Sequence, residues 1–313
     1  MANQRQRERK LEKGIAEGKK ELTAILSKRK RAISGAVWEG VSATKFMQNA
    51  ATRERLYSEI AKEYATLDSD INDWVVSKSK VTSKNWWNYA KEDLPNGSVS
   101  GTFGQFSNKH VENIIGMINP STVSRQVAIN ANIGGMAQNS IRSLRAAVST
   151  TLSEASVEGL TNPQMAQRML RKVGAKNLNQ LIFTDRAGRK WSAERYFSML
   201  NQTLHSNVAR QSYIATATDA GFDLFQIEGG VTGSSLENAS DPCDEWAGKI
   251  ISMTGSTKGY PTYQDALDAG VFHPQCLHFL SAVPPSEMPA AKKQERVEEK
   301  QSDKVADKRE ESE

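Results

Sequence analysis

The distribution of proline constrains the fold of this chain more than any other feature. The first proline is Pro95, and six of the nine prolines follow residue 240. Proline breaks a helix because it lacks a backbone N–H and its ring clashes with the preceding turn. The sequence therefore predicts a helical front and a loop-rich back. The expected fold class is α+β and predominantly helical, with long N-terminal helices, a central helical region and a small C-terminal α+β module.

Five segments are expected from the changes in composition along the 313 residues. The segments are a charged helical N-terminal region (1–92), a loop or linker (93–120), a central helical region (121–180), an α+β module (181–283) and a charged disordered tail (284–313). Within the α+β module we predict a hairpin over 181–191, a helix over 192–220 and a strand over 222–227, because apolar spacing and turn residues alternate there.

One apolar stripe stands out in the N-terminal region. Steps of three or four residues put its members on one helix face. Such a face needs a partner, which is either one of the protein's own helices or another subunit. The stripe spans 56–75 and consists of Leu56, Ile60, Tyr64, Leu67, Ile71 and Trp74.

The first 31 residues are strongly basic, with eleven Lys or Arg against four Glu. A basic helix of this kind either contacts phosphate groups or is simply solvated. The candidate nucleic-acid contacts are Arg5, Arg7, Arg9, Lys10, Lys28, Arg29, Lys30 and Arg31. The chain has no run of 18 apolar residues, and its start lacks the apolar stretch of a signal peptide. We therefore expect a protein without a membrane span that is made and kept in a cytoplasm.

Soft metal ligands gather near the end of the chain. Both cysteines and two of the four histidines lie within residues 243–278, as Cys243, His273, Cys276 and His278. Two sulfurs and two imidazoles form a complete tetrahedral set for structural Zn²⁺. Two alternatives stay open: buried cysteines beside hydrogen-bonded histidines, and a catalytic Cys–His pair. A nuclease-like site could also recruit the nearby acids Asp241, Asp244 and Glu245.

A second group of polar residues shares one helix face at positions i, i+4 and i+7. It consists of Thr203, Asn207 and Arg210. These side chains either form a buried polar ladder that bonds the strand and loop beyond Gly221, or they lie on a solvated face. No phosphate-binding loop, G-x-S-x-G or H-E-x-x-H motif occurs in the sequence, so the common signatures of nucleotide, serine-hydrolase and zinc-protease chemistry are missing.

The order of several short motifs resembles the minor capsid (head-morphogenesis, MuF-like) proteins of tailed bacteriophages. The motifs are F-T-D-R-A-G-R-K-W-S, T-L-H-S-N-V-A-R, G-F-D-L-F-Q-I, D-P-C-D-E-W-A-G-K-I, G-Y-P-T-Y and G-V-F-H-P-Q-C-L-H-F-L. The resemblance is strongest over about 181–283 and extends weakly back to about 120. Many members have a second cysteine shortly after the first, but Trp246 occupies that region here. A four-ligand set therefore requires both histidines.

The resemblance implies a non-enzymatic structural protein of the virion, found at the portal vertex and head interior and in the host cytoplasm during assembly. Its implied role is to aid head assembly, DNA packaging or ejection. The implied partners are the portal protein, the major capsid or scaffold protein, and phage DNA. The cofactor expected from the Cys/His set itself is a structural zinc ion. Two other functions remain open from the residues: a metal-dependent nuclease or hydrolase, and a DNA-binding module that acts through the basic N-terminal arm.

Overall fold

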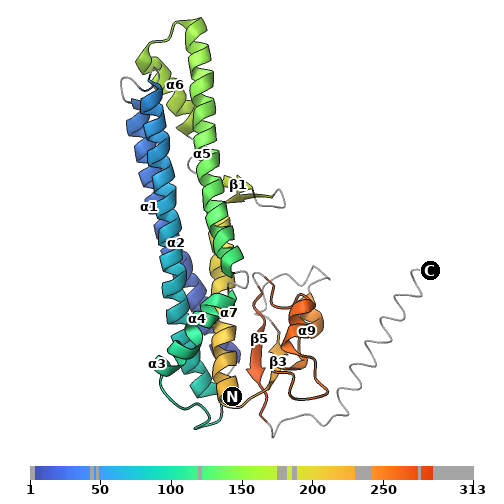
Figure 1. Cartoon of the computed structure of the whole chain (residues 1–313). Coiled ribbons are helices and arrows are strands. Elements are labelled where there is room, and N and C mark those ends of the chain that lie inside the picture. The colour runs from blue at the N-terminus through green and yellow to red at the C-terminus, as the bar shows by residue number, and fades with distance from the viewer. Residues whose placement is uncertain are drawn as a thin grey trace, which may run out of the picture. The chain divides into compact units, whose positions relative to one another are not determined.

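The computed structural model describes residues 4–42, 46, 49–118, 122–174, 182–184, 189–229, 242–273 and 276–284. These residues form mostly helices with a small antiparallel sheet near the C-terminus, which confirms the expected fold class (Figure 1). Two compact units divide the chain. The helical unit comprises residues 5–83 and 107–208, and the sheet unit comprises Gln4, 84–106 and the described residues from 209 onward. Among the described helices, none combines the length and the hydropathy needed to span a membrane.

Six helices account for most of the described residues, and three of them contribute to both units: the first through Gln4 alone, the second and the last. They are α1 (Gln4–Ser42), α2 (Ala50–Asp93), α4 (Glu112–Ile118), α5 (Thr122–Glu158), α6 (Asn162–Gly174) and α7 (Ala193–Asp219). Shorter elements are α3 (Phe103–Phe106), the π-helix η1 (Ser107–Val111), and the hairpin of β1 (Ile182–Thr184) and β2 (Lys190–Ser192). The sheet unit adds β3 (Leu224–Glu228), α8 (Pro242–Trp246), β4 (Ile250–Ser252), α9 (Tyr263–Asp268) and β5 (Phe279–Ala282).

The apolar stripe at 56–75 is covered by the protein's own helices. All six of its side chains are at most 6% exposed. The Trp74 indole donates to Glu21 on α1 at 2.9 Å, and the Tyr64 hydroxyl lies 2.6 Å from Ser140 Oγ on α5. The stripe is therefore core, and the idea that it docks onto another subunit is wrong.

Ion pairs between α1 and α2 show the relative direction of these two helices. Arg29 on α1 donates to Glu63 and Asp70 on α2, at 3.1 and 2.8 Å. Together with the contact between Glu21 and Trp74, these bonds show that α1 and α2 run antiparallel.

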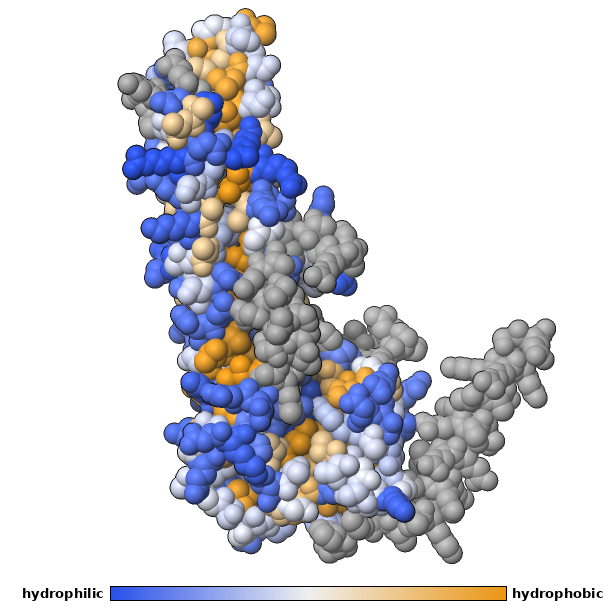
Figure 2. Space-filling view, viewed as in Figure 1, coloured by the Kyte–Doolittle hydropathy of each residue, from blue (hydrophilic) through white to orange (hydrophobic). Residues whose placement is uncertain are grey.

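In the view of Figure 2, hydrophilic residues cover most of the helical surface and hydrophobic residues form a narrow row.

A close approach between α1 and α7 explains the glycine at position 18 of α1. A Cβ atom on Gly18 would lie 2.1 Å from Asn201 Oδ1 and 2.7 Å from His205 Nε2. Only glycine leaves room for these two buried side chains. Asn201 also donates to the backbone carbonyl of Ile15 at 2.8 Å, so it bonds α7 directly to α1. Gly18 is thus required by the packing of α1 against α7.

His205 is a buried titratable residue of the helical unit. Burial, and then the nearby Lys78 charge, lower the pKa of His205 from 6.5 to about 4. Its Nδ1 lies 3.3 Å from Thr82 Oγ1, whereas its Nε2 is buried with no hydrogen-bond partner among the described residues. Protonation would therefore place a positive charge inside the unit that the nearby Glu21 carboxylate offsets only in part.

We expect the helical unit to lose stability as the pH falls from about 6.5 to about 4. A depressed histidine pKa means that the folded state binds fewer protons than the unfolded state in this window, so folding is favoured above it. The full effect is up to about 3 kcal/mol. Thermal unfolding of the wild-type protein and of His205→Gln at pH 7, 5.5 and 4.5 would measure it. A pH dependence that is the same in both proteins would contradict this role.

Two sequence-based boundaries differ from the structure. The segment 93–120 was expected to be a linker, but it is helical from Phe103 to Ile118, because Phe106, Val111 and Ile114 bury apolar side chains there. The predicted domains were contiguous ranges, whereas the compact units combine distant segments. The hairpin is confirmed, with Phe183 paired to Trp191, and so is the long helix that follows it.

In the sheet unit, α7 ends in a glycine turn that leads into the central strand. Gly221 has a φ of 88°, and the N–H of Phe222 donates to the carbonyl of Ala217 at 3.0 Å. This is the bonding pattern of a Schellman motif, which glycine favours because the turn needs a positive φ. β3 then pairs antiparallel with β4 on one side and β5 on the other. Phe279 on β5 packs against Trp86 and Tyr213, with ring centroids 4.9 and 5.3 Å apart.

Candidate metal centre

Cys243 is held in place by the one-turn helix α8 and the turn after it. The N–H of Gly248 donates to the carbonyl of Ile227 at 2.6 Å, and the N–H of Ile227 donates to the carbonyl of Lys249 at 2.8 Å. These bonds attach the end of the α8 segment to the central strand β3. Cys243 is completely buried as a result.

Cys276 and His278 lie just before β5, in a segment that is fixed at both ends. The N–H of Cys276 donates to the carbonyl of His273 at 3.0 Å, which closes a tight turn. The guanidinium of Arg210 on α7 donates twice to the carbonyl of His278, at 3.2 and 3.0 Å. Arg210 is only 2% exposed, so this forked contact anchors the backbone of a candidate ligand from inside the unit.

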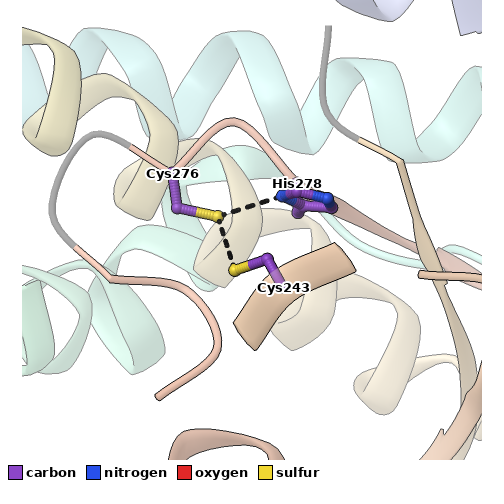
Figure 3. Close-up of side chains that lie close together, drawn as sticks. All are labelled: Cys243, Cys276 and His278. Carbon is purple, nitrogen blue, oxygen red and sulfur yellow. Dashed lines mark hydrogen bonds between the residues drawn. The ribbon is translucent and has the colours of Figure 1, made fainter. Parts of the chain in front are cut away.

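The two sulfurs and one imidazole meet at a single point (Figure 3). Cys243 Sγ lies 3.5 Å from Cys276 Sγ, and Cys276 Sγ lies 3.4 Å from His278 Nδ1. All three ligand atoms lie within 4.8 Å of one another. Around a tetrahedral Zn²⁺ with its usual bond lengths, two sulfurs would be about 3.8 Å apart and a sulfur and a nitrogen about 3.6 Å apart. The donor set and its spacing therefore fit a zinc ion.

The electrostatics of the site favour the form of cysteine that binds metals. The hydrogen bond with Cys243, together with the bonds to His278 and the charge of Arg210, lowers the pKa of the Cys276 thiol well below its usual range and outweighs its burial. Metal ions bind the thiolate and not the thiol. The positive charge of the buried Arg210 guanidinium thus favours the thiolate form of Cys276, which is the form that binds a metal ion.

Phe272, next to His273, has a strained backbone. Its φ is 62°, the only positive φ of a non-glycine residue in the described part of the chain. Bulky residues rarely adopt this conformation, and such strain often marks a functional position. The ring of Phe272 stacks on Tyr263 at 5.8 Å and lies 4.1 Å from the Arg210 guanidinium. These contacts hold the chain in the strained form at the point where it reaches the candidate ligands.

The structure brings together three of the four predicted ligands. His273 contributes its carbonyl to the turn, but its side chain is not in the group of ligand atoms that meet. Of the nearby acids, Glu245 is exposed, and the side chains of Asp241 and Asp244 lie outside the described residues. Within the described residues no carboxylate belongs to the cluster.

The predicted polar face of α7 has three different environments. Thr203 is buried and donates to the carbonyl of Met199 in its own helix at 2.8 Å. Asn207 is half-buried, and Arg210 supplies the anchor to His278. The sequence spacing left open whether Arg210 lies on a buried or a solvated face, and it did not reveal the carbonyl that Arg210 binds.

The candidate nucleic-acid contacts in α1 also separate into classes. Arg29 and Lys30 are engaged by acids of the helical unit, Arg29 by two and Lys30 by Glu194. Arg7 is buried and Lys10 half-buried. The exposed members of the predicted set are Arg5, Arg9, Lys28 and Arg31.

Asp223 organises a loop beside β4 that the sequence did not single out. Its carboxylate accepts hydrogen bonds from the hydroxyls of Ser252, Thr254 and Thr257, each at 2.6 Å, and from the N–H of Thr254 at 2.9 Å. Partial burial would raise the pKa of Asp223, but these hydrogen bonds outweigh it and hold the pKa well below its usual value. One aspartate after the α7 turn thus fixes the 252–257 loop.

We expect Asp223→Asn to destabilise the sheet unit by about 1–3 kcal/mol, because an amide oxygen replaces a carboxylate that accepts several bonds. The wild-type contribution is complete above the unfolded pKa of about 3.9 and is lost as the pH falls toward the lower folded pKa. Urea unfolding at pH 7 would measure the loss. Asp268→Asn, at an exposed position on α9, serves as the matched control and should change little. Equal effects of the two substitutions would contradict the role of Asp223.

Comparison with known proteins adds one match. A family model described as phage minor capsid protein 2 matches residues 132–312. The matched range is more than half of the chain and contains both cysteines and the histidine of the cluster. No curated protein and no solved structure matches this chain.

Proposed function

We propose a role for this chain from its family, because it belongs to the phage minor capsid protein 2 family. The proposed role is that of an assembly protein of the phage head that works beside the portal. Family membership makes it a structural protein of the virion that interacts with other head proteins. The match over residues 132–312 is the observation that carries the proposal. Its location at the portal vertex is a more specific proposal, which the motif resemblance over about 181–283 supports.

The proposed portal contact cannot use the 56–75 stripe, because that stripe is buried inside the helical unit. Co-expression of the chain with portal and capsid proteins, followed by pull-down and mass spectrometry of purified particles, would test the proposal. We expect the chain to be present in particles at low copy number and to be retained by the portal protein. Its absence from particles would contradict the proposed role in the head. Retention by the capsid protein alone would contradict the portal site.

We further propose that a zinc ion held by Cys243, Cys276 and His278 closes the sheet unit, and that the His273 imidazole, which lies outside this cluster, would complete the set by turning inward when the ion binds. The fit of the three donors to tetrahedral spacing supports this role. When bound, zinc would supply cross-linking between α8 and the segment before β5. The chain's own residues prepare the site: Arg210 orients the His278 backbone, and Phe272 sets the direction in which the chain enters it.

A metal-dependent hydrolase is the second candidate, and one observation favours it. Only three protein ligands meet in the described residues, and catalytic zinc sites also use three protein ligands and leave the fourth position open. Incubation of the zinc-loaded chain with duplex and single-stranded DNA and with RNA would separate the two roles. Zinc-dependent cleavage that is lost in Cys276→Ser would establish the hydrolase, and intact nucleic acids would favour the structural role.

A further inference from the structure

The outward face of α1 carries a continuous row of basic and small residues. Successive members are separated by three or four residues, which places them on one side of a helix. All of them are exposed, whereas Leu11, Leu22 and Leu26 on the opposite side are buried. We call this set the basic row: Arg9, Lys13, Ala16, Lys20, Ala24, Ser27 and Arg31.

The row contains no acid, although α1 as a whole does. Glu21 accepts a hydrogen bond from Trp74 and pairs with Lys78, so it is engaged by α2. Glu17 lies 4.0 Å from Lys13, but both side chains are more than half exposed, so this pair is weak. The bases that do have buried or half-buried acid partners, such as Arg29, lie off the row. The helix thus separates structural bases from solvent-facing ones.

We propose that the basic row binds the sugar–phosphate backbone of duplex nucleic acid. Arg9 and Arg31 are 22 residues apart, or about 33 Å along a helix. This is close to one turn of B-DNA, which is about 34 Å long and carries a phosphate charge every 1.7 Å of its axis. The small side chains of Ala16, Ala24 and Ser27 lie between the bases, so a bulky polyanion can approach the helix closely.

The composition of the row distinguishes nucleic acid from a protein partner. Protein interfaces depend on a few aromatic or large side chains in desolvated pockets. Between Arg9 and Arg31 no large apolar side chain of α1 is exposed. Arginine and lysine without such anchors give binding that depends on charge and not on base sequence.

Binding of a fluorescent duplex DNA of arbitrary sequence to the full-length protein, measured over increasing NaCl, would test this assignment. For the wild type we expect log K to fall with log salt with a slope of about 3 to 4, because up to four bases replace counterions. Each base removed should lower the slope by about 1. The row variant should therefore bind at least about tenfold more weakly, with a slope near zero. It carries Arg9→Gln, Lys13→Gln, Lys20→Gln and Arg31→Gln.

A control variant removes the same formal charge from exposed bases of the helical unit that lie off the row. It should retain wild-type affinity and slope. It carries Arg55→Gln, Lys62→Gln, Lys80→Gln and Lys109→Gln. Equal losses in the two variants, or no binding by the wild type at low salt, would overturn the proposal. Poly-glutamate serves as a competitor with the charge of an acidic protein. If it displaces the DNA as well as unlabelled duplex does at equal charge, the row recognises an acidic protein partner and the proposal is overturned. The assay uses neither portal protein nor zinc, so its outcome is independent of those proposals.

Discussion

Replacing both cysteines with serine should unfold the sheet unit while the helical unit stays folded. Zinc at structural sites contributes on the order of 10–16 kcal/mol of apparent binding free energy, whereas whole domains are stable by only about 5–15 kcal/mol. Hydrogen exchange of the β3 and β4 amides in Cys243→Ser/Cys276→Ser would detect the loss. We expect those amides to lose protection and the amides of α5 to keep it.

Chelation of the wild-type protein is the matched control for this variant, because it removes the ion and leaves every side chain in place. The chelated wild type should lose protection over the same strands, and zinc should restore it. The double variant should not respond to chelator or to zinc. If chelation changes nothing and the variant loses only the 1–2 kcal/mol typical of modest core changes, the cysteines are ordinary core residues.

Arg210→Met should weaken zinc binding by about 10- to 100-fold and destabilise the sheet unit by about 1–3 kcal/mol. Outer groups that orient metal ligands have effects of this size on affinity, and a buried carbonyl that loses its donors costs this much. Methionine keeps the apolar part of the side chain, so the change removes the guanidinium contacts to His278 and Phe272 with little loss of volume. Competition with a chromophoric chelator would give the affinity.

The neighbouring residue Gln211 provides the control for Arg210. Its amide donates to the Tyr263 hydroxyl at 2.7 Å, outside the cluster. Gln211→Met should cost about 1 kcal/mol of stability, the net value of one neutral hydrogen bond, and leave the zinc affinity unchanged. If Arg210→Met lowers stability but not zinc affinity, Arg210 supports only the fold.

Local patterns in the sequence predicted local structure well. The absence of proline before Pro95 predicted the long front helices, and the steps from Leu56 to Trp74 predicted a buried face. The cluster was found because soft ligands are rare in this chain, so their concentration between Cys243 and His278 was informative without any tertiary knowledge.

Features that depend on distant contacts were missed. The role of Gly18 is not visible in its own helix, because the side chains that require a glycine there belong to Asn201 and His205, more than 180 residues away. The stripe could not be assigned to its own helices or to a partner until α1 and α5 were seen to cover it. The spacing of His273, Cys276 and His278 did not show which side chains meet Cys243 from the other side of the loop; Cys276 and His278 do, and the His273 imidazole lies outside the cluster.

X-ray absorption at the zinc edge of the reduced, full-length protein tests most directly whether a metal organises the sheet unit. The account predicts one zinc per chain, with two sulfur neighbours at about 2.3 Å and nitrogen neighbours at about 2.0–2.1 Å. The sulfur neighbours should disappear in Cys243→Ser/Cys276→Ser. A protein that is purified without metal, takes up no zinc at neutral pH and keeps its β3 amides protected would contradict the account.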